Sequence, residues 1–282
     1  MTALDWKAKG KYIQIQRHSV FVIDEGISDE ILVILHGYPT SSYDYQKVLP
    51  ALTKKYRVII HDHVGFGFSD KPLGYSYSLM DQATIALKLW KHLGFKKVTL
   101  LAHDYGASIA TEIIARHNNK QIDLQINELI LCNGSIHIEL SRLMLIQKLL
   151  KGKLGKYVAK LSNYFIFSRS IRKVYFDKAK VTDDELEQMW SQIEYNNGKK
   201  VIHLISRYNN QRYTYWKRWV GALKETQIPT KIIWAKEDPV AVRSMARMLT
   251  KEISKNQLYW LDNCGHFSML EKPDEWSKLV LK

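Results

Sequence analysis

Short runs of consecutive apolar residues recur along the chain and end at small or polar residues. The run Ile31–Leu35 ends at His36-Gly37, and similar runs end near residues 61, 102, 132 and 235. A continuous apolar run of strand length predicts a strand that is buried on both faces of a sheet. With two earlier segments, these runs predict strands at residues 11–16, 20–24, 31–35, 57–61, 98–102, 129–132 and 231–235.

Segments of helical length separate these strands, at residues 42–52, 79–93 and 107–117. Alternating strands and helices predict a mostly parallel sheet with helices on both faces. The alternation stops between about residues 135 and 222, where the pattern is helical and rich in aromatic residues. We therefore expect a core formed by residues 1–134 and 223–282, with residues 135–222 inserted as a helical cap over the carboxyl edge of the sheet.

Composition limits the class of protein. The 282 residues are 46% hydrophobic and 25% charged, which is typical of a globular domain. Two cysteines, Cys132 and Cys264, do not suggest a disulfide framework, and no apolar run is long enough to span a bilayer. The first ten residues lack the apolar region of a signal peptide. A cytoplasmic protein, soluble or peripheral to a membrane, is expected.

One segment has the pattern of a nucleophile elbow. In Val98-Thr-Leu-Leu-Ala-His-Asp-Tyr-Gly106, a strand leads into a turn and then a helix, and small residues stand two positions before and after Asp104. Small residues at these positions allow the tight turn that exposes the central side chain in an α/β-hydrolase fold. The alternative is that Asp104 only caps the following helix.

Three further segments complete the pattern of this fold. The loop His36-Gly-Tyr-Pro39 follows the third strand and is expected to supply one oxyanion N–H from Tyr38, while the residue after the nucleophile, Tyr105, supplies the other. His36, with Gly37 and Pro39, is expected to support this loop. Asp238 and His266 follow later strands, so the chain order is nucleophile, acid, histidine. The predicted catalytic triad is therefore Asp104, Asp238 and His266.

Other chemistry has little support. His61-Asp62-His63 lacks a metal-ligand spacing, and no phosphate-binding or dinucleotide-binding motif occurs, so we expect neither a metal nor a cofactor. Ser108 lies within the helix after the elbow, and Cys264 is interpreted as a small filler near the triad. The net charge of +14 indicates either an anionic partner or a solvated basic surface, and no nucleic acid is expected as a partner.

Several motifs resemble the epoxide hydrolase and haloalkane dehalogenase branch of the α/β hydrolases, and in particular hydrolases related to the mesoderm-specific transcript protein. They include His36-Gly-Tyr-Pro-Thr-Ser-Ser-Tyr43, Asp62-His-Val-Gly-Phe-Gly-Phe-Ser-Asp-Lys-Pro72, Leu101-Ala-His-Asp-Tyr-Gly106, Cys132-Asn-Gly134, Gln147-Lys-Leu-Leu150, Phe165-Ile-Phe-Ser-Arg169 and Arg218-Trp-Val-Gly-Ala-Leu223. The resemblance extends from about residue 31 to 274 and includes the cap.

This resemblance implies a carboxylate nucleophile, Asp104, that forms an alkyl ester with a small apolar substrate, and water activated by His266 that hydrolyses the ester. Dehalogenases of the branch hold halide with a tryptophan after the nucleophile and commonly an asparagine after His-Gly, where this chain has Tyr105 and Tyr38. Epoxide hydrolases use cap tyrosines, which points to Tyr208 and Tyr164; the alternative is that both tyrosines only pack. An epoxide hydrolase is expected, with a dehalogenase that has an atypical halide site, or a non-catalytic lipid- or partner-binding protein, as alternatives.

The first part of the cap is basic. Between Arg142 and Lys180 there are eleven lysines and arginines and one acid, Asp177, and apolar residues are interleaved with them. This pattern is typical of helices that lie on an anionic membrane surface. The alternative is that the apolar residues pack on the core and the lysines are only solvated.

Overall fold

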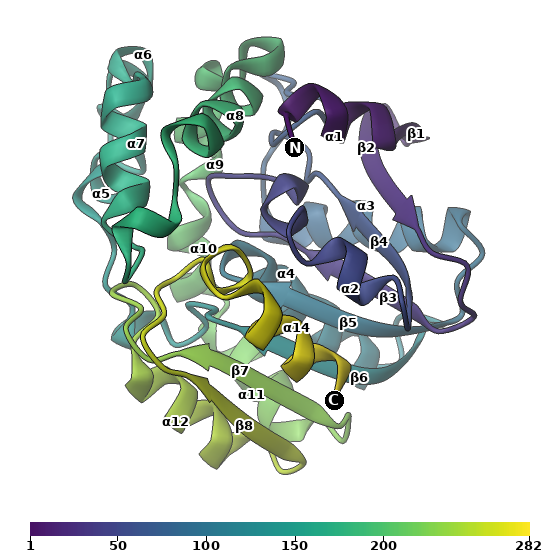
Figure 1. Ribbon diagram of the computed structural model, residues 1–282. Helices are drawn as coiled ribbons and strands as arrows, with labels where there is room; N and C mark the ends of the chain where they lie inside the picture. The colour runs from purple at the N-terminus through teal and green to yellow at the C-terminus, as the bar shows by residue number, and fades with distance from the viewer.

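The computed structural model describes residues 1–282 and is built around an eight-stranded sheet (Figure 1). The strand order is β1-β2-β4-β3-β5-β6-β7-β8; the pairs β1/β2 and β2/β4 are antiparallel and the remaining pairs are parallel. The mostly parallel sheet is thus confirmed. The strands are β1 Lys11–Ile15, β2 His18–Glu25, β3 Ile31–Leu35, β4 Arg57–His61, β5 Lys97–His103, β6 Gln125–Cys132, β7 Thr230–Ala235 and β8 Asn256–Leu261.

Helices cover both faces of the sheet because successive strand residues point to opposite sides. In β3, Val33 and Leu35 pack with residues of α3, α4, α11 and α12, whereas Leu32 and Ile34 pack with residues of α1, α2, α13 and α14. These helices are α1 Ala3–Lys9, α2 Leu49–Leu52, α3 Leu79–His92, α4 Tyr105–Asn118, α11 Trp216–Glu225, α12 Arg243–Glu252, α13 Ser268–Glu271 and α14 Pro273–Leu281.

The helix expected at residues 42–52 is not continuous. A 3-10 turn, Ser42–Tyr45, is followed by the short helix α2, which begins at Leu49 with Pro50 in its first turn. Proline has no N–H to donate and is tolerated only at the start of a helix. The apolar pattern alone did not reveal this break.

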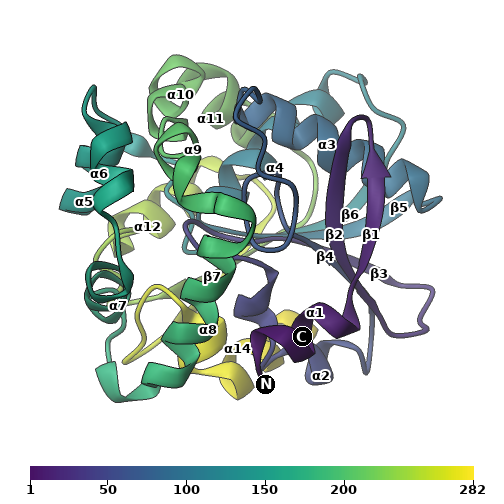
Figure 2. The same cartoon turned by 90° about the horizontal axis from the view of Figure 1, so that it is seen from above.

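The insertion between β6 and β7 is helical and lies beside the carboxyl edge of the sheet (Figures 1 and 2). Its last helix, α11, packs along α4 and contributes Trp219 and Leu223 to the sheet core, so the expected boundary at residue 222 falls inside a core helix. The cap helices are α5 Leu145–Leu150, α6 Gly155–Leu161, α7 Tyr164–Arg172, α8 Asp183–Glu194, α9 Ile202–Ile205 and α10 Tyr208–Thr214, with 3-10 turns at Ile138–Leu140, Lys178–Lys180 and Tyr195–Lys200.

Candidate active site

Asp104 stands at the sharp turn between β5, which ends at His103, and α4, which begins at Tyr105. Its backbone has φ 43° and ψ −105°, a conformation that is strained for a residue with a Cβ atom. The side chain makes no capping hydrogen bond to α4, so the turn does not serve merely to cap the helix. Gly106 allows the tight packing: a Cβ atom there would lie 2.1 Å from the carbonyl oxygen of Leu35.

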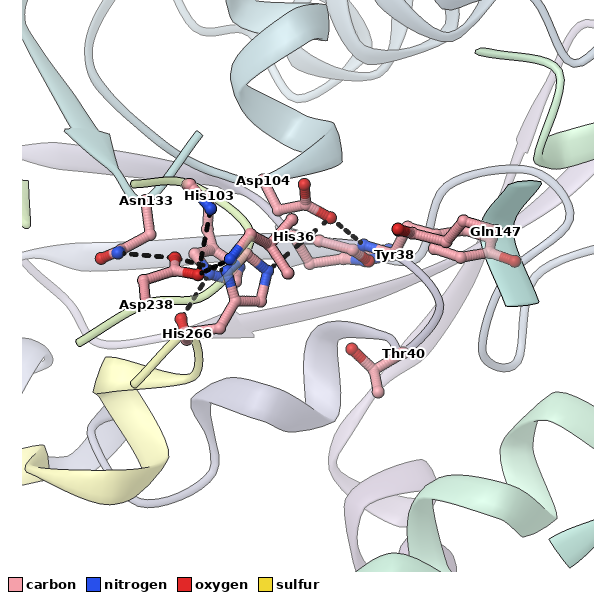
Figure 3. Close-up of polar contacts among 12 residues, drawn as sticks. His36, Tyr38, Thr40, His103, Asp104, Asn133, Gln147, Asp238 and His266 are labelled. Atoms are coloured by element: carbon pink, nitrogen blue, oxygen red, sulfur yellow. Dashed lines mark hydrogen bonds and ion pairs between the residues drawn. The ribbon is translucent and has the colours of Figure 1, made fainter. Parts of the chain in front are cut away.

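The loop after β3 supplies a donor to this carboxylate. The backbone N–H of Tyr38 donates a hydrogen bond of 3.1 Å to Oδ2 of Asp104 (Figure 3). The backbone N–H of Tyr105 is one of the free donors in the first turn of α4, and its service as the second oxyanion donor stays a prediction. Gly37 is required beside Tyr38 because a Cβ atom at that position would lie 2.7 Å from Nδ1 of His103.

His36 contacts this loop through both ring nitrogens, and its role as a support of the loop stays a prediction. Its Nδ1 lies 2.8 Å from the carbonyl oxygen of Gly37, and its Nε2 accepts a hydrogen bond of 3.1 Å from the backbone N–H of His63. One donating and one accepting nitrogen describe a neutral ring. Burial lowers the pKa of His36 to about 4, which keeps the ring in this form at neutral pH.

Asp238 and His266 form the second half of the site. Nδ1 of His266 lies 2.7 Å from Oδ2 of Asp238, which also accepts 2.8 Å from the amide of Asn133 (Figure 3). The other oxygen of Asp238 accepts the backbone N–H groups of Val240 and Ala241. A carboxylate with all these donors is fixed in orientation, and it fixes the imidazole in turn. Sequence reasoning missed Asn133, although its place at the end of β6, on the same sheet edge, was a usable signal.

The imidazole of His266 faces two carboxylates. Burial by itself lowers the pKa of His266, but the charge and hydrogen bond of Asp238 and the charge of Asp104 together raise it to about 9. Nε2 of His266 is 4.0 Å from Oδ2 of Asp104, too far for a hydrogen bond. His266 is therefore a cation at neutral pH while Asp104 carries its charge.

A narrow, largely apolar cavity of about 80 Å³ reaches this site from the cap. Tyr38, Pro39 and His266 line its inner end, and Asp104 lies just beneath them with 2% of its surface exposed. Most of the remaining wall comes from the cap and is apolar, which suits a small or slender apolar substrate. The cap residues of the wall are Met144, Ile146, Gln147, Leu150, Ser162, Asn163, Ile166, Phe167, Ser170, Ile171, Val174, Trp190 and Ile202.

The two predicted cap tyrosines differ in position. Tyr208 is fully buried with its ring 5.6 Å from that of Tyr38 and 4.9 Å from that of Tyr105, and its hydroxyl has no hydrogen-bond partner. Burial and the charge of Asp104 raise its pKa, so the hydroxyl keeps its proton. The hydroxyl of Tyr164 instead donates to the backbone carbonyl of Asp183 at the surface. Neither tyrosine is part of the cavity wall, but the ring of Tyr208 packs against that of Tyr38, which is. The expectation that Tyr164 faces the site is wrong, because in α7 the neighbouring Phe167 and Ile171 point inward.

A buried arginine connects the cap to Asp104. Arg212, in α10, is 2% exposed; its guanidinium donates to Oγ of Ser108 at 2.8 Å and to the backbone carbonyl of Asp104 at 3.3 Å, and lies 3.7 Å from Oδ1 of that residue. It also stacks on Tyr208, 4.5 Å from the ring centre. Sequence reasoning missed this residue, since nothing in the spacing of a basic cap marks one arginine as buried.

Residues 30–273 match the family model described as the alpha/beta hydrolase fold. This chain belongs to that family. Among the relatives of this α/β hydrolase is the mesoderm-specific transcript protein of Mus musculus, which is 39% identical over 279 residues covering 95% of the chain and 83% of the relative.

Solved structures show the same fold. Epoxide hydrolase CorEH superposes with a TM-score of 0.81 at 20% identity over 96% of both chains. Haloalkane dehalogenase DbeA from Bradyrhizobium elkani superposes with a TM-score of 0.82 at 18% identity, over 96% of this chain and 95% of the dehalogenase. The predicted α/β-hydrolase fold is confirmed, and both enzyme classes share it with this chain.

Proposed function

We propose that this α/β hydrolase opens an epoxide to a diol through a covalent ester on Asp104. The observation that carries the proposal is the contact between the N–H of Tyr38 and the carboxylate of Asp104 itself. In a serine hydrolase the oxyanion donors bind the carbonyl oxygen of the substrate. Here the donor already holds an oxygen of the nucleophile, which is the arrangement needed when the ester to be hydrolysed is on the enzyme.

The first step is alkylation. Oδ1 of Asp104 attacks one ring carbon, the bond between that carbon and the epoxide oxygen breaks, and its electron pair passes to the oxygen. That oxygen takes the proton of a general acid, which we assign to Tyr208 because its buried hydroxyl has no partner and retains its proton. Arg212 beside the nucleophile holds the backbone carbonyl of Asp104 during this step.

The second step is hydrolysis of the ester. His266 takes one proton from water through Nε2, the hydroxide adds to the carboxyl carbon of Asp104, and the charge on Oδ2 is stabilised by the N–H of Tyr38. The intermediate collapses, and the leaving diol oxygen takes the proton from His266. The regenerated carboxyl group of Asp104 returns its proton to the Tyr208 phenolate. Water and epoxide are consumed, and the enzyme is restored.

The raised pKa of His266 suits this order of events. While Asp104 is a carboxylate, the pKa of about 9 keeps His266 protonated and unable to accept a proton from water. Ester formation removes the charge of Asp104, and with it one of the causes that raise the pKa. His266 thus releases its Nε2 proton to solvent and acts as a base only after the ester exists, and it takes a proton back from solvent once the Asp104 carboxylate is regenerated.

The decisive experiment traps the ester. The variant His266→Gln is incubated with a panel of apolar epoxides, and its peptides are weighed by mass spectrometry. We expect the peptide that contains Asp104 to gain the mass of the epoxide, and the double variant Asp104→Asn/His266→Gln to gain nothing. An adduct on Ser108 or Cys264 would overturn the assignment of the nucleophile. No adduct and no turnover with any electrophile would favour a non-catalytic binding protein.

A specific observation keeps haloalkanes as a second candidate substrate class. The indole of Trp190, from α8, lines the cavity, and an indole N–H can hold a departing halide. The two candidates separate by product: wild-type protein is given epoxides and haloalkanes, and diol and free halide are measured. Halide release that exceeds diol formation and falls in Trp190→Phe, but not in Tyr208→Phe, would establish the dehalogenase.

A further inference from the structure

The front of the cap exposes large apolar side chains. This cap front consists of residues 142–176, which comprise α5, α6 and α7, the turns that join these helices and the short segments before α5 and after α7. Its most exposed apolar residues have between 65% and 73% of their surface in contact with solvent: Leu145, Leu154, Tyr157, Leu161 and Phe165. Leu149 and Phe176 are about half exposed, at 47% and 49%. The alternative that this apolar face packs on the core is therefore wrong for these residues.

Positively charged residues are interleaved with these side chains along the chain, and among them only Arg172 forms an ion pair, with Asp183. Residues 142–176 contain nine lysines and arginines and no acidic residue. Lys148, Lys153, Lys156 and Lys160 are exposed and form no ion pair. Exposed apolar groups among unpaired cations are costly in water unless another surface covers them, and charge complementarity requires that surface to be anionic.

The same helices form the wall of the cavity. In α5, Gln147 and Leu150 line the cavity while Lys148 and Leu149 face solvent, and in α7 the cavity residue Phe167 lies two positions from exposed Phe165. All three helices stand at one side of the molecule, away from α3 and β5, in both views of the ribbon (Figures 1 and 2). None of the helices has the length and apolar character that crossing a bilayer requires.

We propose that the cap front docks on the surface of an anionic lipid bilayer, so that apolar substrates pass from the bilayer into the cavity above Asp104. Leu149, Leu154, Leu161 and Phe165 enter the boundary between headgroups and acyl chains, and the lysines contact the anionic headgroups. The docking rests on the exposed surface alone; the delivery of substrate rests also on the proposed function. A protein partner fits less well. Its surface would have to be complementary both to the exposed apolar side chains of the cap front and to nine cations with no acidic residue among them.

Vesicle binding tests the electrostatic part. The full-length protein is sedimented with vesicles of phosphatidylcholine alone and of phosphatidylcholine with phosphatidylglycerol, at low and high salt. We expect binding to the anionic vesicles only, weakened by salt. Replacing Lys148, Lys153, Lys156 and Lys160 by Glu should weaken it by about tenfold or more. The matched control replaces Lys54, Lys91, Lys96 and Lys97 by Glu, which changes the net charge equally at exposed positions outside the cap and should retain binding.

A second measurement tests the apolar part. Both native cysteines are buried, so a polarity-sensitive dye can be placed on Leu161→Cys or, as the control, on Lys91→Cys. We expect the dye at position 161 to report an apolar environment on anionic vesicles and the dye at position 91 to report water. The double variant Leu161→Ser/Phe165→Ser should fold normally and bind vesicles less.

Neither measurement uses substrate, so its failure is separate from failure of the epoxide chemistry. Absence of binding at low salt, or equal loss of binding in the cap and control lysine variants, would overturn the docking proposal. So would concentration-dependent dimerisation that Leu161→Ser/Phe165→Ser abolishes, because a second copy of the chain would then cover the cap front. If docking holds, anionic vesicles should raise turnover of a vesicle-dissolved apolar epoxide in wild-type protein and not in the cap lysine variant.

Discussion

The carboxyl edge of the sheet and the cap front lie on opposite sides of one cavity and follow opposite rules. At the sheet edge, polar groups are buried and held by partners: Asp238 accepts four hydrogen-bond donors, and His36 uses both ring nitrogens. On the cap front, apolar side chains are exposed, and every cation except Arg172 lacks an ion-pair partner. The difference teaches that the polar groups of the sheet edge find their partners within the chain, whereas we propose that the cap front finds its partner in another surface.

The largest effect on the polar site at the sheet edge is expected from a change to Asp238, the hydrogen-bond partner of His266. Asp238→Asn should lower turnover by about 10³-fold or more, because an amide in place of the carboxylate no longer selects the Nδ1–H tautomer and no longer stabilises the charged ring. Steady-state kinetics measure the loss, and circular dichroism checks the fold. Asp262→Asn, at an exposed position near the triad, is the matched control and should keep its activity.

The elbow itself should be intolerant of a single methyl group. In Gly106→Ala the new Cβ atom would collide with the carbonyl oxygen of Leu35, a backbone atom that cannot rotate away. We expect the free energy of unfolding to fall by about 3 kcal/mol. Gly221→Ala, in α11 with no neighbour within 4 Å, is the control and should be neutral or stabilising by up to about 1 kcal/mol. Urea denaturation measures the free energy of unfolding of both variants. Equal values for Gly106→Ala and Gly221→Ala would contradict the packing argument.

Arg212, in the cap, contacts Asp104. Arg212→Gln should slow ester formation by roughly 10- to 100-fold, because the variant loses the charge beside Asp104 and its bond to the backbone carbonyl. Hydrolysis of a formed ester should change less, since Arg212 does not contact His266. Rapid-mixing single-turnover kinetics separate the two steps. Arg207→Gln, one turn earlier and exposed, should resemble wild type.

The coupling between the two carboxylates and His266 is measurable by NMR titration. In the wild type the pKa of His266 should be about 9, and in Asp104→Asn it should be lower, because a negative charge has been removed. The raised pKa also means that this histidine stabilises the fold fully below its unfolded pKa of about 6.5 and loses that contribution as the pH rises through about 9. An unchanged pKa in Asp104→Asn would show that Asp104 does not control the base.

The smallest effect should come from Tyr164. Tyr164→Phe removes only a surface hydrogen bond to Asp183, so alkylation and stability should remain close to wild type.

Tyr208→Phe should slow alkylation of the enzyme by about 10²-fold or more through loss of a general acid, with the fold intact. A reversed result would move the acid to α7 and shift the candidate site toward the cap front.

Much of the structure at the carboxyl edge of the sheet was predictable because it depends on local sequence patterns. Strands buried on both faces leave continuous apolar runs, and the sharp turn at Asp104 demands small residues around it, so the strand ends and this turn could be located together. Pro50 marks where this reasoning failed: a regular apolar pattern hid a break that one missing N–H imposes. Asn133 had a signal in its place after β6, which was not used.

By itself, the sequence determined the α/β-hydrolase core, the chain order of Asp104, Asp238 and His266, and the mixed basic and apolar character of residues 142–176. Only the tertiary structure decided which cap side chains face the site. It buried Arg212 against Asp104 and Tyr208 against Tyr105, and it turned Tyr164, Leu161 and Phe165 outward. The physical reason is that short cap helices pack on each other and on the core through contacts distant in sequence, so the inward face of each helix is set by its neighbours rather than by its own periodicity.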